Sequence, residues 1–321
     1  MPDTRPAPDP LPPDVRQLVD HALNGSASID AAQVDRIVAS AGIDVRSLMI
    51  GLLPIAARHA RVPVSGFRVG AVALGASGGI HLGANMEFVG EALAYAVHGE
   101  QSMITTAWLA GEIGIQAIAV NAAPCGHCRQ FIHELVTPSD EIDILISTSV
   151  EPTDLTFTSR PLADLLPSAF GPEDLGVVGG LLQPEEHGLT TTATDPLALE
   201  ALAAANRSYA PHTHDVAGCA IRLRSGAVYT GRLAENAAFN PSISPIASAL
   251  ASMNMTEPPG VPYDLEAAVL VEADAVVSQR SAVEAVLASV APGLELGYVR
   301  AEPVEPCRAA CCSAIVIRSA H

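Results

Sequence analysis

The sequence of 321 residues repeats part of itself at an offset of 148 positions. Six residues coincide: Pro63, Gly70, Ser77, Gly78, Gly83 and Glu87 fall on Pro211, Gly218, Ser225, Gly226, Gly231 and Glu235. Six identities could arise by chance, but most are glycines and prolines, which set strand ends and turns. Self-similarity of this kind indicates a duplicated unit. We therefore expect two domains of one fold.

Periodic apolar residues predict the secondary structure of the first unit. Helices are expected at 15–23, 29–41, 45–60, 90–111 and 128–135, and strands at 69–74 and 117–120. Asp30 followed by Gln33 predicts a capping box at the start of the second helix. Strands that alternate with helices indicate an α/β fold, with each domain built of layers.

Composition changes divide the chain into five parts. Residues 1–13 hold six prolines and predict a mobile leader, and residues 14–44 a small N-terminal helical segment. The first domain is expected at 45–151 and its copy at 191–321. Residues 152–190, polar and rich in proline and acidic side chains, predict an exposed linker.

Charge and cysteine usage exclude several classes of protein. A formal charge of −18 opposes binding to a phosphate backbone, so no nucleic-acid partner is expected. No apolar run reaches the roughly 18 residues of a membrane span, and the N-terminus does not resemble a signal peptide. The six cysteines are unevenly spaced, unlike a secreted disulfide framework. We expect a cytoplasmic protein that acts on a small molecule.

The motif Pro124-Cys125-Gly126-His127-Cys128 follows a strand-like run and precedes a helical one. Its two cysteines are three residues apart on the first turn of a helix, so they can share a metal ion. The helix N-terminus favours the thiolate form that binds zinc. A redox pair or two unrelated cysteines are the alternatives.

A second motif, His98-Gly99-Glu100, completes the candidate site. One histidine and two cysteines make three zinc ligands and leave a fourth tetrahedral position for water, as in catalytic zinc sites. Residues two apart diverge within a helix, so His98 and Glu100 are expected at a helix start, where their side chains can converge. Taken alone, His98 could be a core histidine and Glu100 a solvated acid.

The order H-x-E followed by P-C-x-x-C is the signature of zinc deaminases that act on nucleobases. The chain resembles the long, homodimeric type of bacterial cytidine deaminase, and this resemblance implies two three-layer α/β/α domains related by duplication. The matching stretches are 67–70, 83–88, 98–102, 124–131, 169–172, 204–208 and 234–241. Two features depart from that family: Gly99 stands where alanine is usual, and the last forty residues, with Cys307, Cys311 and Cys312, match nothing known to us.

The resemblance implies one zinc ion per chain, held by His98, Cys125 and Cys128, with Glu100 as the proton shuttle. It implies that cytidine and 2′-deoxycytidine are deaminated to uridine and 2′-deoxyuridine. The substrate contacts that it carries over are Phe67 on the pyrimidine ring, Asn85 and Glu87 on the ribose 3′-hydroxyl, and backbone groups of Gly99 and Ala123 on the base. Arg129 would hydrogen-bond a ligand thiolate, or else lie on the surface.

The second unit lacks the candidate site. At the offset of 148, the positions of His98, Glu100, Cys125 and Cys128 hold Ile246, Ser248, Ala273 and Val276. The resemblance implies a degenerate domain that supports a homodimer and lends Phe239 to the partner's site. Two alternatives stay open: a zinc deaminase of another nucleoside or a nucleotide, and a non-catalytic protein with structural zinc.

Overall fold

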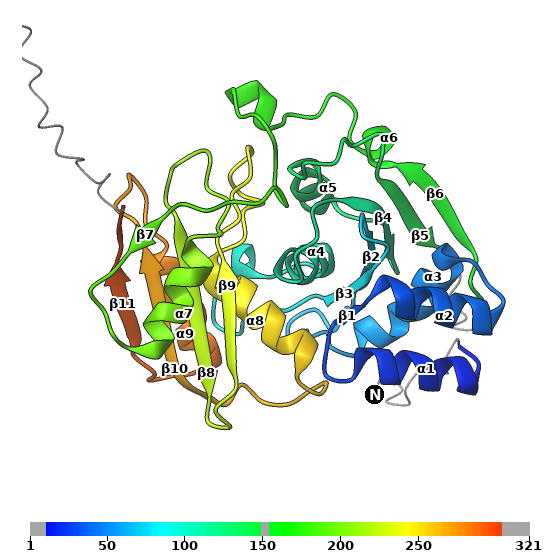
Figure 1. The fold of residues 1–321 in the computed structure, drawn as a ribbon, viewed down its shortest axis with the longest axis horizontal. Helices are drawn as coiled ribbons and strands as arrows, with labels where there is room; N and C mark the ends of the chain where they lie inside the picture. Colours follow the sequence, from blue (N-terminus) through cyan, green and yellow to red (C-terminus); the bar gives the residue numbers. More distant parts are fainter. Residues whose placement is uncertain (1–10, 149–153, 304–321) are drawn as a thin grey trace, which may run out of the picture.

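A computed structural model describes residues 11–148 and 154–303. Two large β-sheets lie on either side of the central helices α4 and α8 (Figure 1), and β7 and β12 form a third sheet of two strands. The helices are α1 (Pro13–Leu23), α2 (Ala31–Ala41), α3 (Val45–Ala57), α4 (Gly99–Leu109), α5 (Gly126–His133), α6 (Leu162–Leu165), α7 (Pro196–Ala205), α8 (Pro245–Thr256) and α9 (Arg280–Val290), with 3-10 turns η1 (Leu93–Tyr95) and η2 (Pro172–Leu175). The strands are β1 (Ser28–Ile29), β2 (Gly70–Gly75), β3 (Ile80–Ala84), β4 (Ile115–Val120), β5 (Asp143–Ser147), β6 (Phe157–Pro161), β7 (Leu189–Thr190), β8 (Ala217–Leu223), β9 (Val228–Arg232), β10 (Leu265–Glu272), β11 (Leu296–Arg300) and β12 (Glu302–Pro303).

The first sheet has the strand order β1-β3-β2-β4-β5-β6, with only β4 and β5 parallel. Helices cover both of its faces. Neighbouring residues of a strand point to opposite faces of the sheet, so Gly70 and Ala71 mark the two sides. A Cβ at Gly70 would meet the backbone of α3, and one at Gly83, which pairs with Ala71, would meet α4. The first domain is thus a three-layer α/β/α sandwich, as expected.

The second sheet, with the order β11-β10-β8-β9, repeats this arrangement. Its parallel pair is β10 and β11, matching β4 and β5. A Cβ at Gly218 would meet α7, and one at Gly231, which pairs with Cys219, would meet α8. Gly218 and Gly231 are the counterparts of Gly70 and Gly83. The fold therefore confirms the duplication predicted from the sequence.

Replacing either member of the Gly83 and Gly231 pair with alanine is expected to destabilise the protein. A Cβ at Gly83 would lie 2.1 Å from the Met103 backbone nitrogen, and one at Gly231 would lie 2.1 Å from that of Ala249. Overpacking of this kind typically costs about 1–3 kcal/mol. Urea denaturation measures the free energy of unfolding.

The control for this pair is Gly297→Ala on β11, where the nearest atom is a Val269 side-chain methyl at 3.0 Å. Because a side chain can move more easily than a helix backbone, the control should lose less stability. Equal losses at all three positions would show that close packing of helix on strand does not set the cost.

A repeated loop gives independent support for the duplication. The Glu87 carboxylate accepts hydrogen bonds from the Val64 nitrogen, the Ser65 nitrogen and the Ser65 hydroxyl. Glu235 accepts the same three bonds from the residues 148 positions further on: the His212 nitrogen, the Thr213 nitrogen and the Thr213 hydroxyl.

The two halves pack through α4 and α8, which lie next to each other at the centre of the molecule (Figure 1). Asn254 of α8 is buried, and its side chain donates to the His59 carbonyl oxygen at 2.8 Å and accepts from Arg61 Nε at 2.5 Å. The Arg61 guanidinium also lies over the Tyr263 ring. Because buried polar groups are costly to leave unpaired, these contacts fix the second half against the loop that follows α3.

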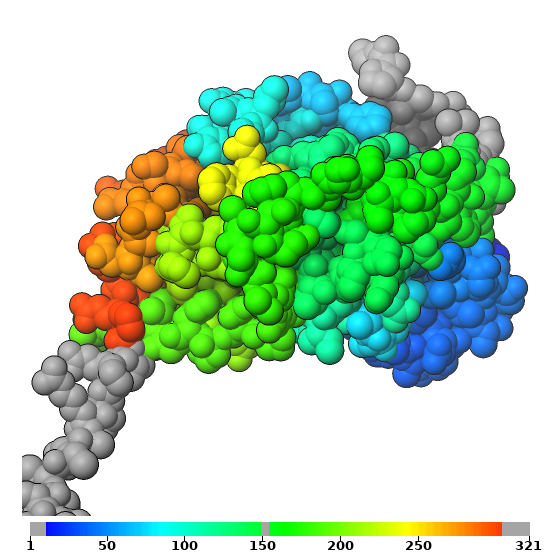
Figure 2. Space-filling model, turned by 90° about the horizontal axis from the view of Figure 1, so that it is seen from above, coloured from blue at the N-terminus to red at the C-terminus, as the bar shows by residue number. Residues whose placement is uncertain are grey.

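Several boundaries differ from those expected. Residues 157–161 form β6 on the edge of the first sheet, and Leu181 and Leu182 are buried, so much of the predicted linker belongs to the fold. Backbone hydrogen bonding to β5 and apolar contacts outweigh its polar composition. Figure 2 shows residues of this segment, in bright green, running across the molecule from the first half to the second.

Two predictions concern the N-terminal part and one the helix before the site. The Asp30–Gln33 capping box is present. Leu11 is buried and α1 begins at Pro13, so the predicted leader is too long by about three residues; its first ten lie outside the described residues. The helix expected at 90–111 begins only at Gly99, because His98 has extended backbone and ends the preceding loop.

No single helix in 11–148 or 154–303 has the length and apolar composition to cross a membrane, although the pair α2 and α3, bent by 100°, passes that test together.

Candidate active site

The candidate ligands lie at the N-termini of two neighbouring helices. His98 is the N-cap residue of α4, and Cys125 is the N-cap residue of α5, with Cys128 one turn further on. The loop after β4 delivers Cys125 to the end of the sheet where α4 begins. His98 and Glu100 therefore share a helix start, and both cysteines lie on a first helical turn, as predicted.

The three donor atoms are close enough to hold one metal ion. His98 Nδ1 lies 3.2 Å from Cys128 Sγ and 3.5 Å from Cys125 Sγ, and the two sulfur atoms are 3.5 Å apart. Tetrahedral zinc, with bonds of about 2.0 Å to nitrogen and about 2.3 Å to sulfur, places its donors roughly 3.5 to 3.8 Å apart. Among the described residues, this is the one cluster of three such side chains. The donor set and its spacing fit zinc.

The electrostatics of the cluster favour a metal-binding thiolate. Hydrogen bonds from Cys128 and His98 lower the pKa of the Cys125 thiol to about 3. The same contact with Cys125 raises the pKa of His98, although burial opposes this. Cys125 is exposed and Cys128 buried, so the cluster opens on the Cys125 side. A thiolate and an imidazole at an accessible helix terminus suit Zn²⁺.

Glu100 lies beside the cluster on the first turn of α4. It is 4% exposed, and burial raises the pKa of its carboxyl, while a hydrogen bond with Cys128 acts in the opposite direction. A buried carboxyl next to a metal site is suited to taking up and releasing a proton. The structure thus brings Glu100 together with all three predicted ligands.

Two neighbours of the site were missed by the sequence interpretation. The Gln101 side chain accepts a hydrogen bond from the His98 nitrogen and donates one to the Pro241 carbonyl oxygen, so it links the metal ligand's backbone to the second half. Its position at N3 of the helix was a usable signal. The His127 ring stacks on that of His98 at 4.8 Å, a contact that spacing alone could not reveal.

Asn85 and Glu87 anchor the loop that carries Phe67. The Asn85 side chain accepts from the Val69 nitrogen and donates to the Phe67 carbonyl oxygen, both at 2.9 Å. Partial burial opposes ionisation of Glu87, but the hydrogen bonds from Ser65 and Val64 prevail and lower the pKa of its carboxyl. A carboxylate offers about four acceptor positions, and three are used here. Each side chain keeps one group free for a ligand hydroxyl.

The remaining predicted contacts lie on segments around the cluster. The Phe67 side chain is 59% exposed, Ala123 is exposed in the loop before α5, and Gly99 is the buried first residue of α4. A Cβ at Gly99 would lie 2.8 Å from a methyl of Val69, so alanine would require that side chain to move. Phe239, 64% exposed, belongs to the second half, where it lines a separate cavity.

Arg129 has a different role from the one expected. Its Nε donates to the Pro124 carbonyl oxygen and its Nη1 to the Leu165 carbonyl oxygen, both at 2.8 Å. The guanidinium is thus occupied by backbone oxygens on either side of α5. It fixes the start of that helix, and no hydrogen bond from it to a thiolate is found.

In the second half, the two corresponding helices begin with residues other than histidine and cysteine. The residue at the N-cap of α8 is Ser244, and the one at the N-cap of α9 is Gln279. By helix start, these two residues correspond to His98 and Cys125. The chain between the starts of α8 and α9 (244 to 279) is longer than that between the starts of α4 and α5 (98 to 125), so an offset of 148 pointed to Ala273 instead of Gln279. Neither alignment provides a metal ligand.

Together, the duplicated α/β/α fold and the His/Cys/Cys cluster with its buried glutamate define a zinc-dependent deaminase. Two family profiles, both described as the cytidine and deoxycytidylate deaminase zinc-binding region, match residues 46–139 and 162–284. The chain belongs to this family.

Similar proteins span nearly the whole chain. The cytidine deaminase of Shewanella halifaxensis is 47% identical over 246 residues, covering 77% of this chain and 79% of its own. That of Shewanella pealeana is 43% identical over 297 residues, covering 92% and 96%. That of Photorhabdus laumondii is 43% identical over 265 residues, covering 82% and 86%.

Proposed function

We propose that this protein hydrolytically deaminates cytidine and 2′-deoxycytidine to uridine and 2′-deoxyuridine, releasing ammonia in pyrimidine salvage. The observation that carries the proposal is the meeting of three candidate zinc donors and a buried carboxylate where the N-termini of α4 and α5 lie together. Three protein donors leave a fourth tetrahedral position for water. A purely structural zinc site would be closed and would give Glu100 no role.

The chain's own groups account for the proton transfers. Zinc, when bound, lowers the pKa of a coordinated water from 15.7 to about 7. Glu100 accepts the proton of the attacking water and passes it to the ring nitrogen. Oxygen adds to carbon 4, the carbon–nitrogen bond to the amino group breaks, and Glu100 delivers the second water proton to the departing ammonia. Low exposure of Glu100 keeps bulk water from competing for these protons.

The contacts that we propose for the sugar come from Asn85 and Glu87, which also hold the loop of residues 64–69. Asn85 and Glu87 hold residues 64–69 in place and keep one group each for the ribose 3′-hydroxyl. Nothing in this pair requires a 2′-hydroxyl, which is why deoxycytidine is included. Phe67 packs on the pyrimidine, and backbone groups of Gly99 and Ala123 contact its edge.

Free cytosine is expected to be a poor substrate, at least 100-fold below cytidine in kcat/KM. Cytosine lacks the ribose hydroxyl, so its hydrogen bonds to the partly buried Asn85 and Glu87 are lost; such a bond contributes about 0.5–1.5 kcal/mol, and about 1.5–3 kcal/mol when one partner is charged. An ultraviolet assay should compare cytidine with cytosine, CMP and adenosine.

Comparable rates on cytosine and cytidine would contradict the nucleoside assignment. Faster conversion of CMP or adenosine would favour the alternative of a nucleotide or another nucleoside as substrate. The control is Glu87→Gln, which should lower the rate on cytidine more than the rate on cytosine.

We also propose that the protein is a cytoplasmic homodimer in which Phe239 reaches the partner's site. Phe239 is 64% exposed, so its ring is accessible to a partner, and its φ of 62° is uncommon for a residue other than glycine. Sedimentation equilibrium should give twice the chain mass of 33.1 kDa. A monomer with full activity would contradict the cross-subunit role.

A further inference from the structure

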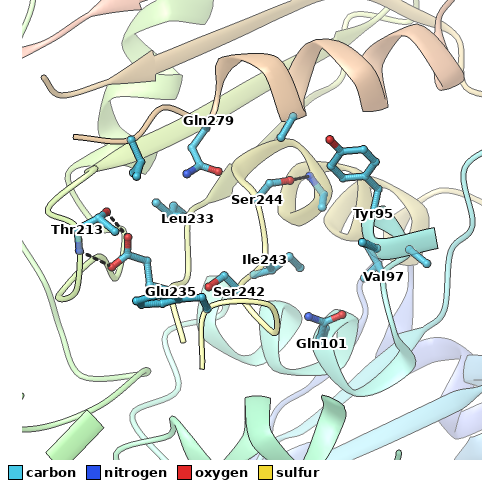
Figure 3. Close-up of a pocket in the computed structure, with 16 residues that line it drawn as sticks. Tyr95, Val97, Gln101, Thr213, Leu233, Glu235, Ser242, Ile243, Ser244 and Gln279 are labelled. Carbon is cyan, nitrogen blue, oxygen red and sulfur yellow. Dashed lines mark hydrogen bonds between the residues drawn. The ribbon is translucent and has the colours of Figure 1, made fainter. Parts of the chain in front are cut away.

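A cavity of about 430 Å³ lies between the two halves, and none of the three candidate zinc donors lines it (Figure 3). The loop before α4 and its first turn supply Tyr95, Val97 and Gln101, and the second half supplies the remaining wall. Small-molecule sites usually measure about 300–1,000 Å³. The cavity is therefore large enough for a nucleoside-sized ligand.

The duplication fixes what this cavity corresponds to. Its walls include Ser244 and Gln279, the N-cap residues of α8 and α9, which stand where His98 and Cys125 stand in the first half. They also include Glu235, which repeats the hydrogen bonds of Glu87. The cavity is thus the counterpart of the candidate active site, with a hydroxyl and a carboxamide in place of metal donors.

The polar groups of the wall select a neutral ligand. Figure 3 shows Gln279 and Ser244 on one side and Glu235 with Thr213 on another. Glu235 is 5% exposed and uses three of its roughly four acceptor positions, which leaves one for a hydroxyl. None of the lining residues is Lys or Arg, so a phosphate would meet only the negative charge of Glu235.

The Gln279 carboxamide is fixed by hydrogen bonds and keeps one donor and one acceptor for a ligand. Its Nε2 donates to Asp215 Oδ2 at 2.9 Å, and its backbone nitrogen donates to Glu272 Oε2 at 2.9 Å. Since one amide hydrogen is used, the carbonyl oxygen and the other hydrogen remain. One acceptor beside one donor matches the edge of a pyrimidine, and the Tyr95 ring provides an aromatic wall.

We propose that this cavity binds a pyrimidine nucleoside without converting it. The sugar hydroxyls donate to Glu235 and the base edge pairs with Gln279. Because no metal donor and no proton shuttle stands at Ser244, Gln279 or Ser248, the ligand is bound but not deaminated. The choice of a pyrimidine nucleoside rests on the proposed function of the first half, whereas the existence of a second site rests on the duplication and the cavity.

The test uses uridine, the proposed product, because it is not consumed. Equilibrium dialysis of radiolabelled uridine against the zinc-loaded protein should give two molecules bound per chain. Ala282→Trp, which fills the cavity from α9, should reduce this to one, while Ala282→Ser should keep two. If the tryptophan variant does not fold, Gln279→Leu removes the pairing group and should weaken the second site at least tenfold.

One uridine per chain in the unmodified protein would overturn the inference, as would two in the folded Ala282→Trp variant. Cytidine turnover should be measured in the same preparations. A protein that binds two uridines but does not deaminate cytidine would contradict the proposed function and leave the second site standing. An active enzyme that binds one uridine would do the reverse.

Discussion

Replacing Glu100 with glutamine is expected to lower the turnover of cytidine by a factor of 10² to 10⁴ or more while leaving zinc bound. General acid–base groups contribute about that much, and glutamine cannot accept the water proton. The side chain is buried beside the donor cluster, so no bulk base can replace it at the same position. Glutamine has nearly the same shape and keeps a hydrogen-bonding group toward Cys128.

Three measurements separate this result from a loss of structure. Zinc content should stay at one ion per chain, the thermal midpoint should change little, and KM for cytidine should change less than kcat. The control is Glu91→Gln, which removes a negative charge from the loop before α4 and should leave turnover within about twofold. Near-normal turnover of the Glu100→Gln protein would remove Glu100 from the mechanism.

Replacing Cys125 or Cys128 with alanine is expected to abolish both zinc binding and deaminase activity. Each variant leaves two of the three donors that lie within 3.5 Å of one another. Two protein ligands are too few to hold a tetrahedral zinc ion tightly. Loss of the zinc ion removes the group that activates the water, so activity is lost with it. The purified unmodified protein should carry one zinc ion per chain by metal analysis.

The matched control is Cys219→Ala, which removes a fully buried thiol of β8 that lies in the core of the second half. It should lower stability slightly and keep both zinc and activity. Two tightly bound ions per chain, or one that persists in the Cys125→Ala protein, would contradict a single site. The second result would direct attention to Cys307, Cys311 and Cys312, which lie outside the described residues.

Local patterns predicted the catalytic half well, because its key residues sit at helix starts. Spacing alone placed His98 with Glu100 and Cys125 with Cys128, since an N-cap and first turn depend on only a few consecutive residues. The capping box at Asp30 was correct for the same reason. The predicted start of the helix at residue 90 was wrong, since α4 begins at Gly99. The prediction of an exposed linker was wrong in part, because the pairing of β6 with β5 and the burial of Leu181 depend on partners distant in sequence.

By itself the sequence determined that one fold occurs twice and that only the first copy keeps the candidate zinc donors, and it singled out Glu100 as the carboxylate beside them. Identity of residue type at fixed intervals was sufficient for these conclusions. Only the tertiary structure decided that Gln101 ties His98 to the second half, that Arg129 binds backbone oxygens, and that a cavity remains at the second pair of helix starts. Those features arise where segments distant in sequence meet in space: Arg129 and Leu165 are 36 residues apart, and Gln101 and Pro241 are 140 apart. No interval along the chain records such contacts.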